Sequence, residues 1–396
     1  MPLGTYISVP FCRTKCSYCN FASDVFSRAV FERYVDRVCA DIVNASQAAT
    51  LMGGQIEREV DSIFLGGGTP TVLEGVQLER IFATVRQQFE VSREAEITVE
   101  CAPGTLTQEM LASLGRCGVN RVSLGVQSFV DQEAAAVGRL HKRETVLADI
   151  AHLRSAGIMN VNVDLIAGLP HQTAESWDFS LTETIATGVP HMSVYMLEVD
   201  EDSRLGRELL AGGTRYHAHF VPDEGAVADY YLAACERLHS AGIAQYEISN
   251  FARERFESRH NLKYWTRQPY CGFGVDAHSM LASATHENES VRFASPDSLE
   301  KYTSGITDLK RTAVSRGAAL EESFFLGLRL NQGLNLRALA VKFGESAIEN
   351  ARAAIAELVA SGLMERRGDC VCLTPRGRLL SNEVFERFIL TDQVAS

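Results

Sequence analysis

The sequence PFCRTKCSYCNF, residues 10–21, places Cys12, Cys16 and Cys19 in the order C-x3-C-x2-C. Residues 5–9, TYISV, come just before it and have the short, β-branched composition of a strand. The cysteine loop therefore follows the carboxyl end of the first predicted strand. Three thiols this close together can bind one compact metal centre.

Four kinds of site compete for the cysteine loop. A structural zinc site needs four ligands, and no further Cys or His precedes residue 39. A redox pair formed by Cys16 and Cys19 would leave Cys12 without a role, and purely structural thiols would not usually cluster beside basic residues. Thiolates also suit iron–sulfur chemistry. The pattern favours a 4Fe-4S cluster held by Cys12, Cys16 and Cys19, with one iron open to another ligand.

Strand-like and helix-like segments alternate through the first half of the chain. Short apolar or β-branched runs occupy residues 5–9, 62–65, 96–100, 121–126, 160–166 and 193–197. Longer stretches with helical periodicity occupy residues 30–43, 77–89, 108–114, 145–155 and 176–187. This order predicts an α/β fold with a parallel sheet, in which functional residues gather at the carboxyl ends of the strands.

The second half of the chain has a different character. Residues 201–222 are polar and contain glycine, which predicts a linker, and residues 223–241 predict a helix. The elements expected near the carboxyl terminus are a helix at 346–361, a hairpin of strands at 363–367 and 370–373, and a closing helix at 375–390. Helices followed by a small hairpin predict a winged-helix-like module.

A glycine-rich turn ends the second predicted strand. Residues 64–71 read FLGGGTPT, with Gly66, Gly67 and Gly68 in succession. Glycines allow a ligand to approach the backbone closely, and exposed N–H and C=O groups can hold its polar atoms. A glycine run alone is often only a tight turn. This run, however, lies one βα unit after the cysteines, and that position favours its interpretation as the second part of a ligand site.

At this point the chain resembles the radical S-adenosylmethionine superfamily. The resemblance covers the whole first half and rests on the C-x3-C-x2-C motif. It implies a partial (β/α)6 barrel in which S-adenosylmethionine chelates the open iron through its amino and carboxylate groups. It also implies that an electron from the cluster can cleave the sulfonium and give a 5′-deoxyadenosyl radical.

Within the superfamily, the chain is most similar to the branch that contains oxygen-independent coproporphyrinogen III dehydrogenase and the HemW-type haem chaperones. The resemblance implies that Gly67 and Gly68 hold the methionine amino group. Arg139 suits the methionine carboxylate, because guanidinium pairs with carboxylate bidentately. Acidic and amide side chains at strand ends suit the ribose hydroxyls, although each of them alone could be a solvated polar residue. The implied S-adenosylmethionine contacts are Tyr6, Tyr18, Gly67, Gly68, Thr69, Glu100, Gln127, Arg139 and Asp164.

Two features distinguish this chain from the coproporphyrinogen dehydrogenase that it resembles. That enzyme carries a further Cys two residues after the last cluster ligand, whereas this chain has Phe21 there. That enzyme also has a long segment before its cysteines, whereas eleven residues precede Cys12 here. Both features resemble the HemW-type haem chaperones instead.

The second half carries a motif of its own. HNLKYW, residues 260–265, fits the H-N-x-x-Y-W motif of HemW-type proteins, where it is implicated in haem binding. Imidazole and tyrosinate are both haem iron ligands, so His260 and Tyr264 are the implied haem-binding residues. Trp265 and Tyr270 could cover a porphyrin face, and the side chains that could pair with haem propionates are Arg259, Lys263 and Arg267. The alternative is that His260 belongs to a turn that is hydrogen-bonded to the core.

The resemblance implies three parts of the chain: a radical-SAM core at 1–205, a HemW-like segment at 206–319 and a winged-helix-like module at 320–396. The expected function is that of a haem chaperone, which binds haem, a 4Fe-4S cluster and S-adenosylmethionine and delivers haem to acceptor proteins. The alternative is a radical-SAM enzyme, either a coproporphyrinogen III dehydrogenase acting on a tetrapyrrole or a radical methyltransferase. No catalytic residue is assigned, and whether the chain is an enzyme stays open.

Charge and composition limit the partners. The 396 residues carry 38 Lys and Arg against 50 Asp and Glu, for a net charge of −12. Such a chain should not bind nucleic acid or anionic membrane through bulk charge. No secretory signal or membrane-length apolar run is visible, which predicts a cytoplasmic protein. The expected partners are haem, haem acceptors and an electron donor, with membrane association only through such partners, and the chain is expected to be a monomer or dimer.

Overall fold

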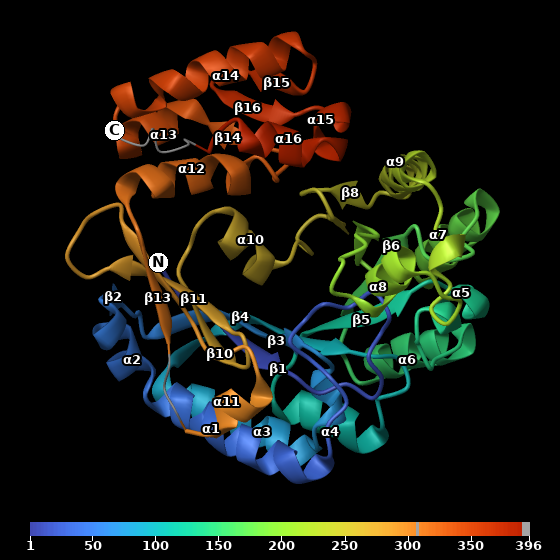
Figure 1. Cartoon of the computed structure of the whole chain (residues 1–396). Coiled ribbons are helices and arrows are strands. Elements are labelled where there is room, and N and C mark those ends of the chain that lie inside the picture. Colours follow the sequence, from blue (N-terminus) through green and yellow to red (C-terminus); the bar gives the residue numbers. More distant parts are fainter. Residues whose placement is uncertain (306–308, 390–396) are drawn as a thin grey trace.

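The computed structural model describes residues 1–305 and 309–389, and its centre is a sheet of parallel strands (Figure 1). All six strands predicted in the first half are confirmed. They are β1 (Leu3–Val9), β3 (Glu59–Gly67), β4 (Glu90–Cys101), β5 (Arg121–Gln127), β6 (Asn160–Ala167) and β7 (His191–Met196). They are parallel and lie side by side in the order β1-β3-β4-β5-β6-β7. Their carboxyl ends therefore meet at one edge.

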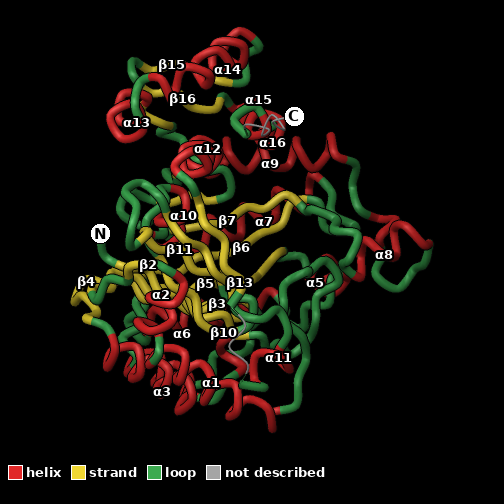
Figure 2. Tube along the Cα trace, turned by 60° about the vertical axis from the view of Figure 1, so that its left-hand side comes forward, coloured by secondary structure: helices red, strands yellow, loops and turns green. Residues whose placement is uncertain are grey.

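Helices cover the outer face of this sheet, as alternating βα units require (Figure 2). Phe31, Tyr34, Val38 and Ile42 share one buried face of α1. Their spacing of three or four residues explains why this segment is a helix that packs on the strands. The helices that follow the strands are α1 (Phe31–Val43), α3 (Gly75–Gln88), α4 (Gln108–Arg116), α5 (Asp131–Ala136), α6 (Arg143–Ser155) and α7 (Ala174–Thr187).

The segment 201–222 is not the linker that its composition predicts. It contains α8 (Arg204–Ala211), which begins where the Ser203 hydroxyl accepts a hydrogen bond from the Gly206 N–H. Leu205 is fully buried, and its N–H donates to the carbonyl oxygen of Ser17 in the cysteine loop at 2.8 Å. The prediction failed because a few apolar side chains within a polar sequence were enough to dock a short helix.

The middle of the chain extends the sheet at both edges. After α9 (Glu224–Ser240), β8 (Ala244–Gln245) and β9 (Asn250–Ala252) add antiparallel strands beside β7. At the other edge, β10 (Tyr270–Gly274) runs parallel to β1. The strands that complete this edge are β2 (Gly54–Gln55), β11 (His278–Ser283), β12 (Ser290–Ala294) and β13 (Lys310–Val314). One apolar core consequently runs from Leu3 to Tyr302.

Gly274 allows β10 to lie against β1. Its φ angle is +104°, and a Cβ atom at this position would collide with the backbone carbonyl of Ser8. Only glycine adopts this conformation readily and leaves room for the neighbouring strand. The close approach of β10 places Tyr270 beside Gly4 near the start of β1, and Gly274, with the turn that follows it, beside Ser8 near the carboxyl end of β1.

The carboxyl-terminal part has a second core of its own. Its elements are α12 (Arg316–Gly327), β14 (Leu334–Asn335), α13 (Leu336–Phe343), α14 (Glu349–Ala360), β15 (Met364–Arg367), β16 (Cys370–Leu373), α15 (Pro375–Leu379) and α16 (Ser381–Glu386). The predicted hairpin is confirmed as β15 and β16. The predicted closing helix is two short helices, because Leu380 has a φ of −106° and a ψ of 31°, outside the helical range. Residue 390 lies outside the described residues.

The short helix α10 (Arg259–Trp265) lies between the barrel strands and this module (Figure 1). The remaining helices are α2 (Ala45–Met52) and α11 (Leu299–Thr303). Within residues 1–305 and 309–389, no helix has the length and apolar character needed to cross a bilayer.

Candidate functional site

The cysteine loop folds back on itself at the carboxyl end of β1. The Cys12 N–H donates to the carbonyl oxygen of Asp24 at 3.0 Å, and the Cys19 N–H donates to that of Cys16 at 3.3 Å. The Ser17 N–H donates to the carbonyl of Val137 at 3.2 Å. These bonds hold the three thiols in one compact loop. All three cysteines are free thiols, and Cys16 is buried whereas Cys12 and Cys19 are partly buried.

The three thiols are close enough to influence one another. Burial raises the pKa of the Cys12 thiol, and the neighbouring Cys19 and Cys16 add to the rise, while hydrogen bonds from Ser23 and Thr69 oppose it. A bound iron–sulfur cluster would reverse this effect, because positive iron stabilises thiolates. Three soft donors from one loop fit such a cluster. In the described part of the chain, no three His, Cys, Asp or Glu side chains are placed to hold one single metal ion.

The glycine turn at the end of β3 packs directly on the cysteine loop. The Gly68 N–H donates to the Val9 carbonyl at 2.7 Å. A Cβ atom at Gly68 would lie 2.7 Å from the Phe11 carbonyl oxygen and 3.0 Å from the Cys12 sulfur. Gly68 is therefore required for the contact between turn and loop. The neighbouring Gly67 has a φ of +99°, a conformation that favours glycine.

Thr69 joins this contact. Its side chain is buried, and its hydroxyl lies 3.9 Å from the Cys12 sulfur, within hydrogen-bond range for sulfur. Its N–H donates to the Phe11 carbonyl at 2.7 Å. Residues about 55 positions apart in the sequence thus form one structural unit around the first thiol.

Arg139 contacts the cysteine loop through Tyr18. Arg139 Nη2 donates to the Tyr18 hydroxyl oxygen at 3.1 Å, and the Arg139 Nε is buried with no hydrogen-bond acceptor among the described residues. Burial raises the pKa of Tyr18, and the Arg139 charge opposes the rise. A buried guanidinium with an unsatisfied donor is the group that a ligand carboxylate would pair with.

Gln127 occupies a strained position at the end of β5. Its φ is +71°, which is uncommon for a residue with a side chain, and the pairing register of β5 with β6 shifts between Gly125 and Gln127. Gln127 is also buried. Such strain persists where the surrounding structure fixes it, and it gathers at ligand sites. The geometry is compatible with the predicted role of Gln127 in cofactor binding.

Two partly buried carboxylates, Glu100 and Asp164, line the same cavity. Glu100 accepts a hydrogen bond from the Gly67 N–H at 3.2 Å, and burial together with the Asp164 charge raises the Glu100 pKa to about 8. Asp164 accepts from Ser123 at 3.1 Å and from Asn162 at 2.7 Å, and burial raises its pKa. A cationic ligand would stabilise the charged forms of both groups. The pair therefore fits a ligand with a positive charge and hydroxyl donors.

The helix α10 presents the HNLKYW segment to the barrel. The Glu96 carboxylate accepts hydrogen bonds from the Arg259 and His260 N–H groups at 3.1 and 3.0 Å. His260 is 1% exposed, its Nδ1 lies 3.0 Å from the Ser62 hydroxyl and its Nε2 lies 2.8 Å from the Tyr264 hydroxyl. Burial, with a smaller effect of Lys263, lowers the His260 pKa to about 3. His260 is a neutral, fully bonded histidine here.

The basic residues predicted to meet propionates have partners inside the protein. Lys263 Nζ lies 2.7 Å from the Asp61 carboxylate and donates to the Pro2 carbonyl at 2.9 Å. Arg267 pairs with Glu322 at 2.8 Å. Both cations therefore contribute to the attachment of α10 and of the carboxyl-terminal module rather than projecting into a cavity.

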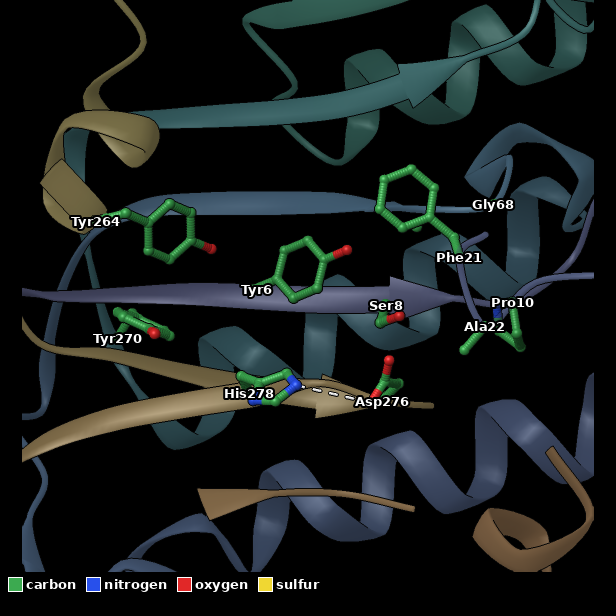
Figure 3. Close-up of a pocket in the computed structure, with 11 residues that line it drawn as sticks. Tyr6, Ser8, Pro10, Phe21, Ala22, Gly68, Tyr264, Tyr270, Asp276 and His278 are labelled. Atoms are coloured by element: carbon green, nitrogen blue, oxygen red, sulfur yellow. Dashed lines mark ion pairs between the residues drawn. The ribbon is translucent and has the colours of Figure 1, made fainter. Parts of the chain in front are cut away.

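Two cavities lie against the strands, and Tyr6 and Tyr264 line both of them. The second cavity, of about 290 Å³, brings the predicted cofactor residues Glu100 and Asp164 together with His260. The first, of about 270 Å³, is shown in Figure 3 and includes Gly67 and Gly68. The predicted cofactor site and the predicted haem segment, separate in the sequence, thus adjoin one another.

The sequence analysis missed a group of polar residues that line the same two cavities. Asn162, for example, donates to Asp164 and Ser123, and the His191 ring bonds Asn162 and Tyr246 at 2.7 and 2.9 Å. Polar residues at alternate positions of an otherwise apolar strand, such as NVNVDL at 160–165, were the available signal. The missed lining residues are Arg121, Ser123, Asn162, His191, Ser193, Tyr195 and Asn250 in the second cavity and Asp276 and His278 in the first.

Comparison with known families matches two parts of the chain. Residues 6–181 match the model of the radical SAM superfamily, and residues 314–380 match that of the HemN C-terminal domain. The solved structure of the coproporphyrinogen III oxidase HemN from Escherichia coli superposes with a TM-score of 0.82 at 24% identity, covering 98% of this chain and 90% of that one. The likeness confirms the predicted radical-SAM α/β fold and its carboxyl-terminal helices and antiparallel sheet.

Curated relatives extend the match over nearly the whole chain. The "Heme chaperone HemW" of Bacillus subtilis is 33% identical over 98% of this chain and 99% of its own length. The protein of the same name from Escherichia coli is 34% identical over 71% of this chain and 70% of its own length. The radical SAM superfamily is defined by a 4Fe-4S cluster and S-adenosylmethionine, which the three thiols and the two carboxylates fit. By sequence similarity over almost all of its length, the chain belongs to the HemW family within the radical SAM superfamily.

Proposed function

We propose that this protein binds haem and delivers it to acceptor proteins, and that it holds a 4Fe-4S cluster and S-adenosylmethionine beside the haem. In this proposal residues 1–205 hold the cluster and S-adenosylmethionine, residues 206–319 supply the haem-binding segment, and residues 320–396 form a docking module. The partners are a haem acceptor and an electron donor, and the place of action is the cytoplasm. The similarity to proteins named "Heme chaperone HemW" supports it.

The proposed cluster ligands are Cys12, Cys16 and Cys19, and the proposed cofactor contacts lie around them. Gly67, Gly68 and Thr69 form the turn on the cysteine loop, and Arg139 offers a buried donor to a carboxylate. The remaining proposed contacts with S-adenosylmethionine are Tyr6, Tyr18, Glu100, Gln127 and Asp164. A cluster and S-adenosylmethionine bound at these residues would supply one-electron chemistry at the sulfonium. The residues of the chain orient the cofactor and balance its charge.

The observation that carries the haem proposal is the position of Tyr264. This residue of the HNLKYW segment lines both cavities, and the His260 ring fixes its hydroxyl. A tetrapyrrole at the barrel mouth would contact Tyr264 and lie next to the cofactor pocket. His260 and Tyr264 are accordingly proposed as haem-binding residues, with His260 acting on Tyr264 through their hydrogen bond.

The test is haemin titration of anaerobically reconstituted protein, with and without S-adenosylmethionine, followed by visible absorption. We expect saturable binding of haemin and a spectrum that differs from that of free haemin. The same preparation should be incubated with coproporphyrinogen III, S-adenosylmethionine and a reductant. Conversion to protoporphyrinogen IX would overturn the chaperone proposal in favour of an enzyme, and lack of saturable haemin binding would also overturn it.

A further inference from the structure

Two hydroxyl groups lie beside the sulfur of Cys12, the first thiol of the cysteine loop. One belongs to Thr69 in the glycine turn, whose Oγ1 lies 3.9 Å from the Cys12 Sγ. The other belongs to Ser23, which favours the thiolate form of Cys12 and so opposes the rise in the pKa of that thiol. Both side chains are buried, with 8% of Thr69 and 5% of Ser23 exposed.

The backbone holds Ser23 next to Cys12. The Cys12 N–H donates to the carbonyl oxygen of Asp24 at 3.0 Å, and the Asp24 N–H donates to that of Pro10 at 3.0 Å. These bonds pair the segment that follows the cysteine loop with the chain that enters it. From within the loop, Lys15 Nζ donates to the Ser23 carbonyl oxygen at 2.5 Å. The loop therefore fixes the position of Ser23 before any cofactor binds.

The Ser23 hydroxyl has no oxygen or nitrogen partner among the described residues. A buried hydroxyl without a good acceptor costs free energy, and native proteins contain few of them. The Cys12 sulfur beside it is a weak acceptor as a thiol. It becomes a strong acceptor as a thiolate, which is the form that ligates iron. A cluster held by Cys12 would thus supply the acceptor that Ser23 lacks.

A hydrogen bond to a ligating sulfur changes the electron affinity of an iron–sulfur cluster. Such bonds are among the features that set the reduction potential of these clusters. The reduced cluster carries one more negative charge than the oxidised cluster, so a hydroxyl donor stabilises the reduced form more strongly. A donor at the Cys12 sulfur should therefore make the cluster easier to reduce.

From these observations we infer that Ser23, together with Thr69, raises the reduction potential of the 4Fe-4S cluster by donating hydrogen bonds to the Cys12 thiolate. The inference rests on the proposed cluster and names two residues outside the cysteine motif that adjust it. Neither hydroxyl binds iron, and no covalent bond forms or breaks. Thr69 is expected to contribute less than Ser23, because 3.9 Å is long even for a hydrogen bond to sulfur.

The experiment is an anaerobic redox titration of the reconstituted full-length protein, followed by electron paramagnetic resonance of the reduced cluster. S-adenosylmethionine is left out, so that the proposed contact between Thr69 and this cofactor does not contribute. The variants are Ser23→Ala, Thr69→Val and the double variant. The matched control is Ser279→Ala, because Ser279 is 1% exposed and its hydroxyl lies 3.8 Å from the sulfur of Cys271, outside the cysteine loop.

We expect Ser23→Ala to lower the ratio of reduced to oxidised cluster at a fixed potential by about three- to tenfold. A tenfold change corresponds to ~59 mV for a one-electron couple. Thr69→Val should shift the ratio in the same direction by less, the double variant should shift it at least as far as Ser23→Ala, and Ser279→Ala should titrate as the wild type.

Electron–nuclear double resonance in deuterium oxide gives a second readout. The reduced wild-type cluster should couple to an exchangeable deuteron that Ser23→Ala lacks and Ser279→Ala retains. A wild-type protein that assembles no cluster would overturn the proposed cluster itself. An unchanged potential and unchanged couplings in Ser23→Ala would overturn only the inference, as would an equal shift in Ser279→Ala. A Ser23→Ala protein that binds no cluster would also overturn it, because a hydroxyl that only adjusts the potential is not needed for assembly.

Discussion

The imidazole Nε2 of His260 lies 2.8 Å from the phenolic oxygen of Tyr264, one helical turn further along α10. This contact connects a buried core residue, held by Ser62 of β3, to a residue that lines both cavities. The spacing of four residues in HNLKYW is the spacing that places two side chains on one face of a helix. The motif therefore builds part of the cavity wall even without a bound ligand.

The first prediction concerns the acid sensitivity that His260 confers. Its pKa falls from 6.5 in the unfolded chain to about 3 in the folded protein, because burial disfavours the charged ring. Between these values the unfolded chain binds a proton that the folded protein does not, so the free energy of unfolding should decrease as the pH falls from 6.5 toward about 3. Urea denaturation of the apoprotein at a series of pH values should show a shallower decrease in His260→Gln than in the wild type.

The control for this measurement is His286→Gln, whose side chain is 68% exposed. It should leave the pH dependence of the unfolding free energy unchanged. At neutral pH, Tyr264→Phe should cost about 1–3 kcal/mol, because it leaves the His260 Nε2 without its partner in a buried site. A pH dependence identical in the wild type and His260→Gln would contradict the assignment of His260 as a neutral core residue.

The second prediction is that replacing Cys12, Cys16 or Cys19 with Ala removes the iron–sulfur cluster. Each variant should lose the visible charge-transfer absorption after reconstitution and should bind little iron or acid-labile sulfide. Cys271→Ala is the control, because Cys271 is a buried thiol in β10 away from the cysteine loop. Full iron content in the triple variant would show that the cluster is bound elsewhere.

The third prediction is that Gly68 is needed for the contact with the cysteine loop, and not only for the conformation of its own turn. A methyl group in Gly68→Ala would lie about 3.0 Å from the Cys12 sulfur and closer still to two carbonyl oxygens. The variant should therefore lower both cluster loading and S-adenosylmethionine affinity. Gly115→Ala is the control, since a Cβ atom there meets nothing within 4 Å and alanine favours the helix. Normal iron content in Gly68→Ala would contradict this prediction, because the cysteine loop would then bind the cluster even when the added methyl group displaces it.

The fourth prediction follows from Glu100, whose pKa rises from 4.5 to about 8 through burial and the nearby Asp164. Between these values the folded apoprotein holds a proton that the unfolded chain has released, so the free energy of unfolding should decrease as the pH rises through this range. One pKa unit corresponds to about 1.4 kcal/mol, and because Glu100 lies beside an open cavity we expect a total decrease of roughly 1–3 kcal/mol. Glu100→Gln should remove this decrease, as followed by chemical denaturation.

The same carboxyl group should make cofactor binding dependent on pH. The sulfonium of S-adenosylmethionine is positive and favours ionised Glu100, so its affinity should increase up to about pH 8 in the wild type and stay flat in Glu100→Gln. Glu254→Gln, with a side chain that is 90% exposed, is the control and should behave as the wild type. A wild-type affinity independent of pH would place the cationic part of the cofactor away from Glu100.

Local patterns in the sequence determined much of the architecture. Short apolar runs separated by helical periodicity gave all six parallel strands, because burial on both faces requires continuous apolar residues. The turn Gly68-Thr69 and the cysteine loop could be recognised because each is a contiguous motif. The polar segment 201–222 was misjudged, since composition alone does not reveal that Leu205 docks against the cysteine loop.

The sequence by itself determined the succession of strands and helices along the first half, the thiol loop and the identity of the HNLKYW motif. Only the tertiary structure decided that β10 lies beside β1, which places His278 and Tyr264 on the wall of one cavity with Gly67 and Gly68. The physical reason is that parallel strands far apart in the chain pair through backbone hydrogen bonds, which carry almost no trace in side-chain pattern. The role of a histidine likewise depends on which groups that pairing brings to its ring: hydroxyls from two elements surround His260, whereas His278 faces an open cavity.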